Sequence, residues 1–150
     1  MQNPFSIIAF WTVLPSVIMS SQIDCPCELK RDFVSCQEHT IDSMPLDFQH
    51  KCPDLMEKSS SIRGFDLKSQ TMTEVLPYAF NEFNNLVAIV LSFNQIQEVH
   101  DGAFDGLNYL TSLSLSHNNI SKVPNGVFDK LISLHQLDLS YNPIENFTTK

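Results

Sequence analysis

The sequence has little glycine, few basic residues, and no cysteine outside one short segment. Only 4 of its 150 residues are glycine and 43% are hydrophobic, which excludes a collagen-like chain and argues against a disordered one. Nine Lys and Arg stand against 17 Asp and Glu, so the formal net charge is −8. A nucleic-acid partner usually requires a basic stripe, and we therefore expect no nucleic acid.

Charged residues are absent before Asp24. The stretch 5–19 is rich in Phe, Ile, Val and Leu, and Ser20 and Ser21 supply small residues at a cleavage position, as in a secretory signal peptide. No Lys or Arg precedes this apolar core, and the alternative is an uncleaved signal anchor, because the uncharged run is nearly long enough to span a bilayer. We expect a signal peptide over residues 1–22 and a secreted, extracellular mature chain without a membrane span.

All four cysteines follow this segment, at Cys25, Cys27, Cys36 and Cys52. An even, clustered count in a secreted chain predicts two disulfides, for which three connectivities exist. The alternative is a zinc site, but a C-x-C opening differs from the C-x2-C of structural zinc sites. We expect a disulfide-linked cap over residues 23–61 and no metal.

The rest of the chain repeats every 24 residues. Segments that begin at Leu86, Leu110 and Leu134 read LVAIVLSFNQI, LTSLSLSHNNI and LHQLDLSYNPI, and each fits L-x-x-L-x-L-x-x-N-x-L with Leu or Ile at the apolar positions. A weaker copy begins at Ile62 and has Gln70 in place of the asparagine. The expected repeats are 62–85 (degenerate), 86–109, 110–133 and 134–150 (partial). Three or more stacked units are enough for a stable repeat array.

Alternation within each copy predicts a short strand with one face turned inward. The sharp turn after the strand leaves backbone groups facing the interior, where they need partners. An asparagine amide offers both donors and an acceptor, so we expect a ladder between adjacent coils formed by Asn94, Asn118 and Asn142. A second interior column is expected from the phenylalanines that recur at the same spacing, Phe80, Phe104 and Phe128.

This pattern resembles the leucine-rich repeat family, in its 24-residue extracellular form, over residues 62–147. The cysteine segment resembles that family's amino-terminal cap, without the additional cysteine that usually precedes C-x-C. The resemblance implies a short right-handed α/β solenoid with a parallel β-sheet on its concave face. By analogy with the family's crossed pairing, we expect the disulfides Cys25–Cys36 and Cys27–Cys52. The C-P-C and K-C-P-D-L segments are also similar to those of arthropod leucine-rich repeat proteins likened to the non-catalytic subunit of a shrimp luciferase.

The carboxyl end departs from the family pattern, because no cysteine follows Cys52. Such proteins usually close the last coil with a second cysteine-rich cap. We expect one of two explanations. Either the chain is a fragment from which this cap or a membrane anchor is missing, or a partner covers the last coil.

Motifs for catalysis are missing from the sequence. The histidines form neither H-x-H nor H-E-x-x-H, and there is no G-x-S-x-G and no P-loop. Ser112, Ser114 and Ser116 alternate along a strand with no base at a fixed spacing, as on a solvated sheet face. We expect a chain that is not an enzyme and holds no cofactor.

Two sequons, Asn119-Ile120-Ser121 and Asn146-Phe147-Thr148, predict N-glycosylation at Asn119 and Asn146 in a secreted chain. Asn119 lies beside the ladder position, so its side chain is expected to reach solvent.

The outward face of the strands is the expected ligand site. Phe93, His117 and Tyr141 recur on successive coils, and large exposed rings are typical of interface anchors; the alternative is that they pack against the turn they border. The expected protein-binding residues are completed by Val90, Ser114 and Asp138. The resemblance implies a non-catalytic protein-binding module in immune recognition, matrix adhesion or receptor signalling, and the fold does not choose among these roles. The alternative is a subunit that stabilises a secreted oxidative enzyme.

Overall fold

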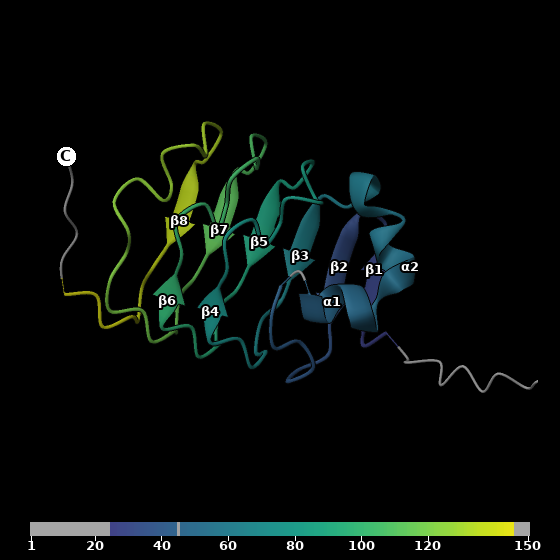
Figure 1. Cartoon of the computed structure of the whole chain (residues 1–150), viewed down its shortest axis with the longest axis horizontal. Coiled ribbons are helices and arrows are strands. Elements are labelled where there is room, and N and C mark those ends of the chain that lie inside the picture. Colours follow the sequence, from purple (N-terminus) through teal and green to yellow (C-terminus); the bar gives the residue numbers. More distant parts are fainter. Residues whose placement is uncertain (1–24, 45, 146–150) are drawn as a thin grey trace, which may run out of the picture.

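The computed structural model describes residues 25–44 and 46–145, in which short strands lie side by side along one axis with the helices at one end (Figure 1). The larger group of strands is β1 Cys27–Lys30, β2 Phe33–Cys36, β3 Gly64–Asp66, β5 Ala88–Val90, β7 Ser112–Ser114 and β8 Gln136–Asp138. The remaining elements are α1 Leu46–Lys51, α2 Pro53–Met56, the 3-10 turn Ser59–Ser61, β4 Glu74–Val75 and β6 Glu98–Val99. The predicted signal peptide and the sequon at Asn146 lie outside the described residues.

The main sheet follows the order β1-β2-β3-β5-β7-β8, with β1 and β2 antiparallel and every later pair parallel. Residues 24 apart face one another, so that Ile89 lies opposite Leu113 and Leu113 opposite Leu137. A second, smaller sheet pairs β4 with β6. The predicted parallel solenoid is confirmed, and both of its described α-helices lie in the amino-terminal cap. None of the described helices is long and apolar enough to cross a membrane.

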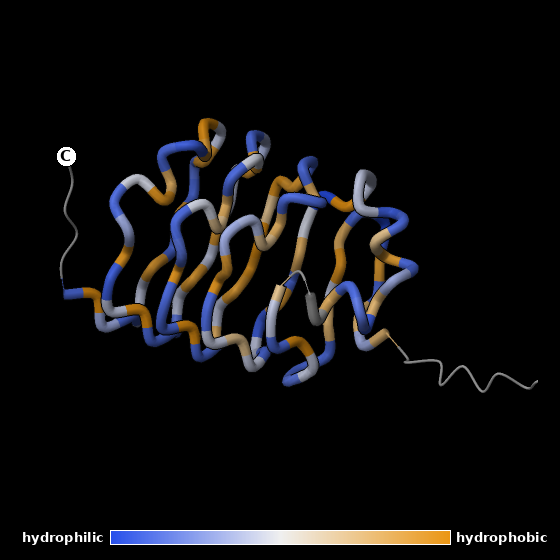
Figure 2. Tube along the Cα trace, in the orientation of Figure 1, coloured by the Kyte–Doolittle hydropathy of each residue, from blue (hydrophilic) through white to orange (hydrophobic). Residues whose placement is uncertain are grey.

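Aromatic side chains fill the space between the strands and the return segments. Phe80 stacks on Phe104 with ring centroids 6.2 Å apart, and Phe104 stacks on Phe128 at 5.9 Å. At the cap end of this column Phe65 lies 6.1 Å from Phe80, and Phe48 of α1 meets the Phe65 ring edge-on at 5.3 Å. Figure 2 shows apolar residues at matching places in successive coils, as expected when each coil buries its face against the next.

Asparagine side chains tie each coil to the one before it. The Asn94 amide nitrogen donates to the Leu67 and Leu91 carbonyls at 2.9 and 3.0 Å. Asn118 and Asn142 make the equivalent pairs of bonds one and two coils further on. On the acceptor side, the backbone N–H groups of Met72, Ile96 and Ile120 donate to Asn94, Asn118 and Asn142 at 3.2, 3.0 and 3.0 Å.

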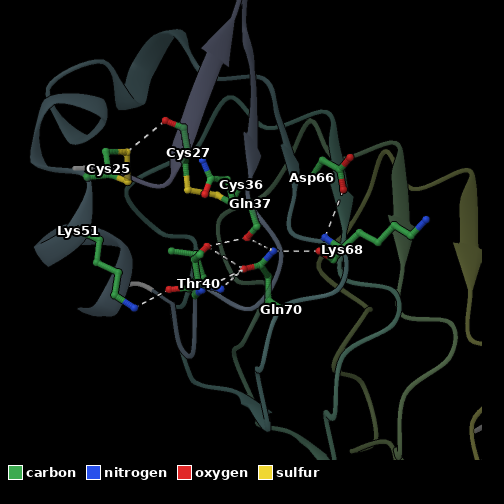
Figure 3. Close-up of a disulfide and its surroundings, with 11 residues drawn as sticks. Cys25, Cys27, Cys36, Gln37, Thr40, Lys51, Asp66, Lys68 and Gln70 are labelled. Carbon is green, nitrogen blue, oxygen red and sulfur yellow. Dashed lines mark hydrogen bonds between the residues drawn. A yellow bond between two sulfur atoms is a disulfide. The ribbon is translucent and has the colours of Figure 1, made fainter. Parts of the chain in front are cut away.

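Gln70 takes the asparagine's place where the first coil meets the cap (Figure 3). Its amide oxygen accepts the backbone N–H groups of Thr40 and Ile41 at 3.1 and 2.9 Å. Its amide nitrogen donates to the Gln37 and Lys68 carbonyls, each at 2.9 Å. The longer side chain therefore reaches a cap segment that does not follow the repeat spacing.

The expected disulfide pairing is wrong. The structure links Cys27 to Cys36 and Cys25 to Cys52, rather than Cys25 to Cys36 and Cys27 to Cys52. The reason is the β1–β2 hairpin, which places Cys27 directly opposite Cys36 with their Cα atoms 3.9 Å apart. Cys25 lies before this hairpin and is left to join Cys52, a buried residue between α1 and α2. One bridge thus closes the hairpin, and the other fastens it to the helices.

Candidate functional site

The register of the main sheet arranges its outward side chains in rows that cross the strands. Alternate residues of each strand face away from the core, and parallel pairing brings equivalent positions together. We call one of these the acidic-ended row, which consists of Asp66, Val90, Ser114 and Asp138. The neighbouring row consists of Gly64, Ala88, Ser112 and Gln136. Because the central side chains of both rows are short, they project little from the sheet, and the middle of the face leaves the strands accessible to a partner.

A column of rings borders this face where the strands end. Phe93 and His117 lie parallel with centroids 4.2 Å apart, and His117 and Tyr141 lie parallel at 4.1 Å. Phe93 is 49% exposed and Tyr141 is 75% exposed. The rings therefore pack on one another and present a continuous aromatic column to solvent, which we call the aromatic column.

The aromatic column is built on strained backbone. Phe93, His117 and Tyr141 have φ angles of 58°, 54° and 56°, in the left-handed region. A side chain other than glycine occupies this region at a cost of roughly 1–3 kcal/mol. Backbone hydrogen bonds to the next coil help to hold the conformation, with Phe93 donating to Ser116 at 3.1 Å and His117 donating to Ser140 at 3.0 Å.

A lysine ammonium covers the end of the aromatic column nearest the cap. Lys68 Nζ lies 5.0 Å from the centroid of the Phe93 ring, within the range of a cation–π interaction. The backbone N–H of Lys68 donates to Asp66 Oδ1 at 3.2 Å. The column therefore already accepts one positive charge from the chain itself.

Asp138 holds a negative charge at the other end of the acidic-ended row. The Ser140 hydroxyl and backbone N–H donate to Asp138 Oδ1 at 2.7 and 3.0 Å. These two bonds stabilise the carboxylate and lower the pKa of Asp138 below its ordinary value, with smaller contributions from Ser116 and His117. Asp138 is therefore ionised at neutral pH.

Phe33 is part of this face, although the repeat pattern does not include it. It pairs in register with Gly64, and a Cβ added to Gly64 would overlap the Phe33 ring at Cε1. The ring thus lies flat over a position without a side chain, and Phe33 remains 44% exposed. The signal that could have found it is the glycine at the start of the first coil, where the later coils have Ala88 and Ser112.

Within residues 25–44 and 46–145, the one group of His, Cys, Asp or Glu side chains close enough to hold a metal ion is made of cysteines. The sulfur atoms of Cys25, Cys27 and Cys52 lie within 4.8 Å of one another, but each belongs to a disulfide rather than to a set of thiolates. Ser114 and Ser116 face each other, with their hydroxyl oxygens 3.2 Å apart. His100 lies on the smaller-sheet side, 2.7 Å from Glu74.

Asn119 is exposed, whereas Ile120 beside it is buried. The backbone N–H of Asn119 donates to the Ile96 carbonyl at 2.8 Å, which joins this residue to the preceding coil. The neighbouring Asn118 points its amide inward. The sequon asparagine therefore faces solvent, two residues after His117 in the sequence.

A groove of about 660 Å³ lies away from this face, between β6 and the segment 121–125. No full strand follows β6 there, since Lys122 is a single bridge residue and Pro124 stands at the position equivalent to His100, whose N–H donates to the Val75 carbonyl. Proline has no N–H to continue the pairing. The groove is lined by residues of these two segments and contains none of the rings of the aromatic column.

Comparison with known proteins agrees with this geometry. Residues 84–144 match the family model described as leucine rich repeat. No curated protein matches the chain in sequence.

Solved structures resemble the chain in fold. The leucine-rich repeat domain of APL1B is 20% identical, with a TM-score of 0.58, and the match covers 69% of this chain and 28% of that one. A TLR13–ssRNA13 complex gives 23% identity and a TM-score of 0.60, and the match covers 79% of this chain and 20% of that one. The chain thus spans less than a third of the length of these relatives.

Proposed function

This chain is a leucine-rich repeat protein, and on that premise we propose that it is a secreted, non-catalytic module that binds a protein on the outward face of its main sheet. The binding residues are Phe93, His117 and Tyr141 of the aromatic column, with Val90, Ser114 and Asp138 beside them. Binding of this protein ligand would serve immune recognition, matrix adhesion or receptor signalling.

The observation that carries this proposal is the aromatic column. Three large side chains stack on one another at the same position of three successive coils, and they stay partly exposed rather than buried in the core. Large rings on a rigid sheet lose little conformational entropy when a partner covers them, which suits them as anchors.

Secretion is supported by the cap. Both described disulfides need an oxidising compartment to form and persist. An exposed sequon at Asn119 fits the same route, because N-glycosylation takes place on exported chains.

The test is capture of partners from native secretions on the immobilised mature chain, comparing three forms. The variant Phe93→Asn with Tyr141→Asn removes two rings but keeps a residue type that tolerates positive φ. The matched control is Tyr109→Asn, which removes a 61% exposed ring from a return segment. Circular dichroism and a thermal melt confirm that each variant is folded.

We expect a protein that the wild type and Tyr109→Asn retain and that the double variant loses. Equal retention by all three forms would place binding elsewhere and contradict the proposal. An oxidative enzyme as the retained protein would identify the chain as its non-catalytic subunit, whereas retention of RNA alone would replace protein by nucleic acid as the ligand.

A further inference from the structure

Resting on the proposed function, we propose that the ligand presents an extended segment with Arg or Lys at positions i and i+4, which crosses the main sheet along the acidic-ended row. The two basic side chains meet Asp66 and Asp138, and the residue at i+2 lies over Val90 and Ser114.

The spacing of the carboxylates sets the i, i+4 pattern. Asp66 and Asp138 are separated by three strand steps, from β3 through β5 and β7 to β8. Strands lie about 4.8 Å apart, so the two positions are about 14 Å apart. An extended chain advances about 3.4 Å per residue, so four residues cover this distance and bring both basic side chains to the same side.

Both carboxylates are open to a partner's charge. Asp66 and Asp138 are exposed, and neither forms an ion pair with another described residue. The nearest ammonium group on the first coil, that of Lys68, lies over the Phe93 ring instead. In contrast, the next carboxylate in the same direction, Glu28, is paired with Lys30 at 2.9 Å.

The middle of the row accepts a backbone at close range. Val90 and Ser114 are half-buried and short, and the aromatic column borders them on one side. A small apolar residue at i+2 would cover Val90, while the residues at i+1 and i+3 point away from the sheet. The overall charge of −8 favours the approach of a basic segment at long range.

A polyanion is the less suitable occupant of the same row. Its phosphates would meet two carboxylates that have no ion-pair partner among the described residues, and these carboxylates repel them. Binding of RNA to this face is therefore an outcome that would contradict the inference.

The probe is the labelled peptide Gly-Ser-Arg-Ser-Val-Ser-Arg-Ser-Gly, measured by fluorescence anisotropy against the mature chain. A peptide of the same composition, Gly-Ser-Arg-Val-Arg-Ser-Ser-Ser-Gly, places the arginines at i and i+2. We expect the i, i+4 peptide to bind at least about threefold more tightly, because only it reaches both carboxylates.

The protein variants Asp66→Asn and Asp138→Asn are each expected to weaken binding of the i, i+4 peptide about two- to fivefold. Glu82→Gln is the matched control, since it removes one negative charge from an exposed residue on a return segment. Equal affinity for the two peptides, an equal effect of Glu82→Gln, or no binding of either peptide at millimolar concentration would overturn the inference.

Failure of this inference is distinguishable from failure of the proposed function. If retention of a native partner requires Phe93 and Tyr141 but the two peptides bind with equal affinity, the inference of a basic i, i+4 segment is wrong. Protein binding at the aromatic column then still stands. If no native partner depends on these rings, the proposed function falls, and the inference falls with it.

Discussion

At the scale of single residues, neighbouring asparagines have unrelated roles. Asn118 donates to the Leu91 and Leu115 carbonyls and accepts from Ile96, whereas Asn119 directs its side chain to solvent. A position in the repeat, rather than the residue type, therefore decides whether the amide supports the fold.

The variant Asn118→Ala leaves buried turn groups without partners, and we expect it to lower the free energy of unfolding by roughly 1–3 kcal/mol. Asn119→Ala is expected to change it by about 0.5 kcal/mol or less. Urea unfolding of both variants after removal of N-glycans measures the difference. Equal losses would contradict the assigned phase of the repeat.

Ser140 is expected to control the charge of Asp138. The variant Ser140→Ala removes the hydroxyl donor and should raise the pKa of Asp138 toward its ordinary value. Because the folded pKa lies below the unfolded one, the stabilisation by this carboxylate is present above the unfolded pKa and is lost as the pH falls through the folded pKa. Titration of the Asp138 carboxyl carbon by NMR provides the measurement, and an unchanged pKa would show that the hydroxyl is not the cause.

At the scale of elements, the cap adapts a repeating sheet to a non-repeating start. The hairpin β1–β2 extends the parallel sheet by one antiparallel pair, and Phe48 of α1 plugs the interior beneath it. The hairpin is symmetric about Arg31 and Asp32, so equal distances from this turn already place Cys27 opposite Cys36. The predicted pairing was wrong because it followed the crossed pattern of the family and not this hairpin symmetry.

Disulfide mapping tests the arrangement of the cap. Digestion without reduction, followed by fragmentation that cleaves between Cys25 and Cys27, should link Cys27 to Cys36 and Cys25 to Cys52. A link between Cys25 and Cys36 would instead restore the crossed pairing and contradict the hairpin.

The contact of Phe33 with Gly64 joins β2 to β3 and gives a second prediction for these elements. The variant Gly64→Ala puts a Cβ where the Phe33 ring lies, and we expect a loss of about 1–3 kcal/mol in the free energy of unfolding. Adding Phe33→Ala removes the overlap, so the double variant should lose less than the sum of the two single variants. Strict additivity in thermal or urea unfolding would show that the ring does not lie on Gly64.

At the scale of the whole molecule, the repeat made most of the fold predictable. A constant spacing of 24 residues fixes which positions pair, so the sheet order after β3 and the inward rows follow from the sequence. The rows of outward residues follow by alternation. The cap had no such periodicity, so the contacts of Phe33 and Gln70 follow from its packing and not from the 24-residue spacing.

The positive φ angles in the aromatic column also could not be predicted from the sequence. Nothing in the types Phe93, His117 and Tyr141 indicates a positive φ, since this conformation is imposed by the turn that follows every strand. It affects how the site must be tested, because an alanine at these positions would be strained as well, whereas asparagine is tolerated.

The most direct test of protein binding at the aromatic column is the affinity of the captured partner for purified variants. By calorimetry, Phe93→Asn and Tyr141→Asn should each weaken binding by more than about 1 kcal/mol, or roughly fivefold, as expected for interface anchors. Tyr109→Asn should leave the affinity unchanged. A loss of affinity in Tyr109→Asn together with full affinity in the two column variants would contradict the account.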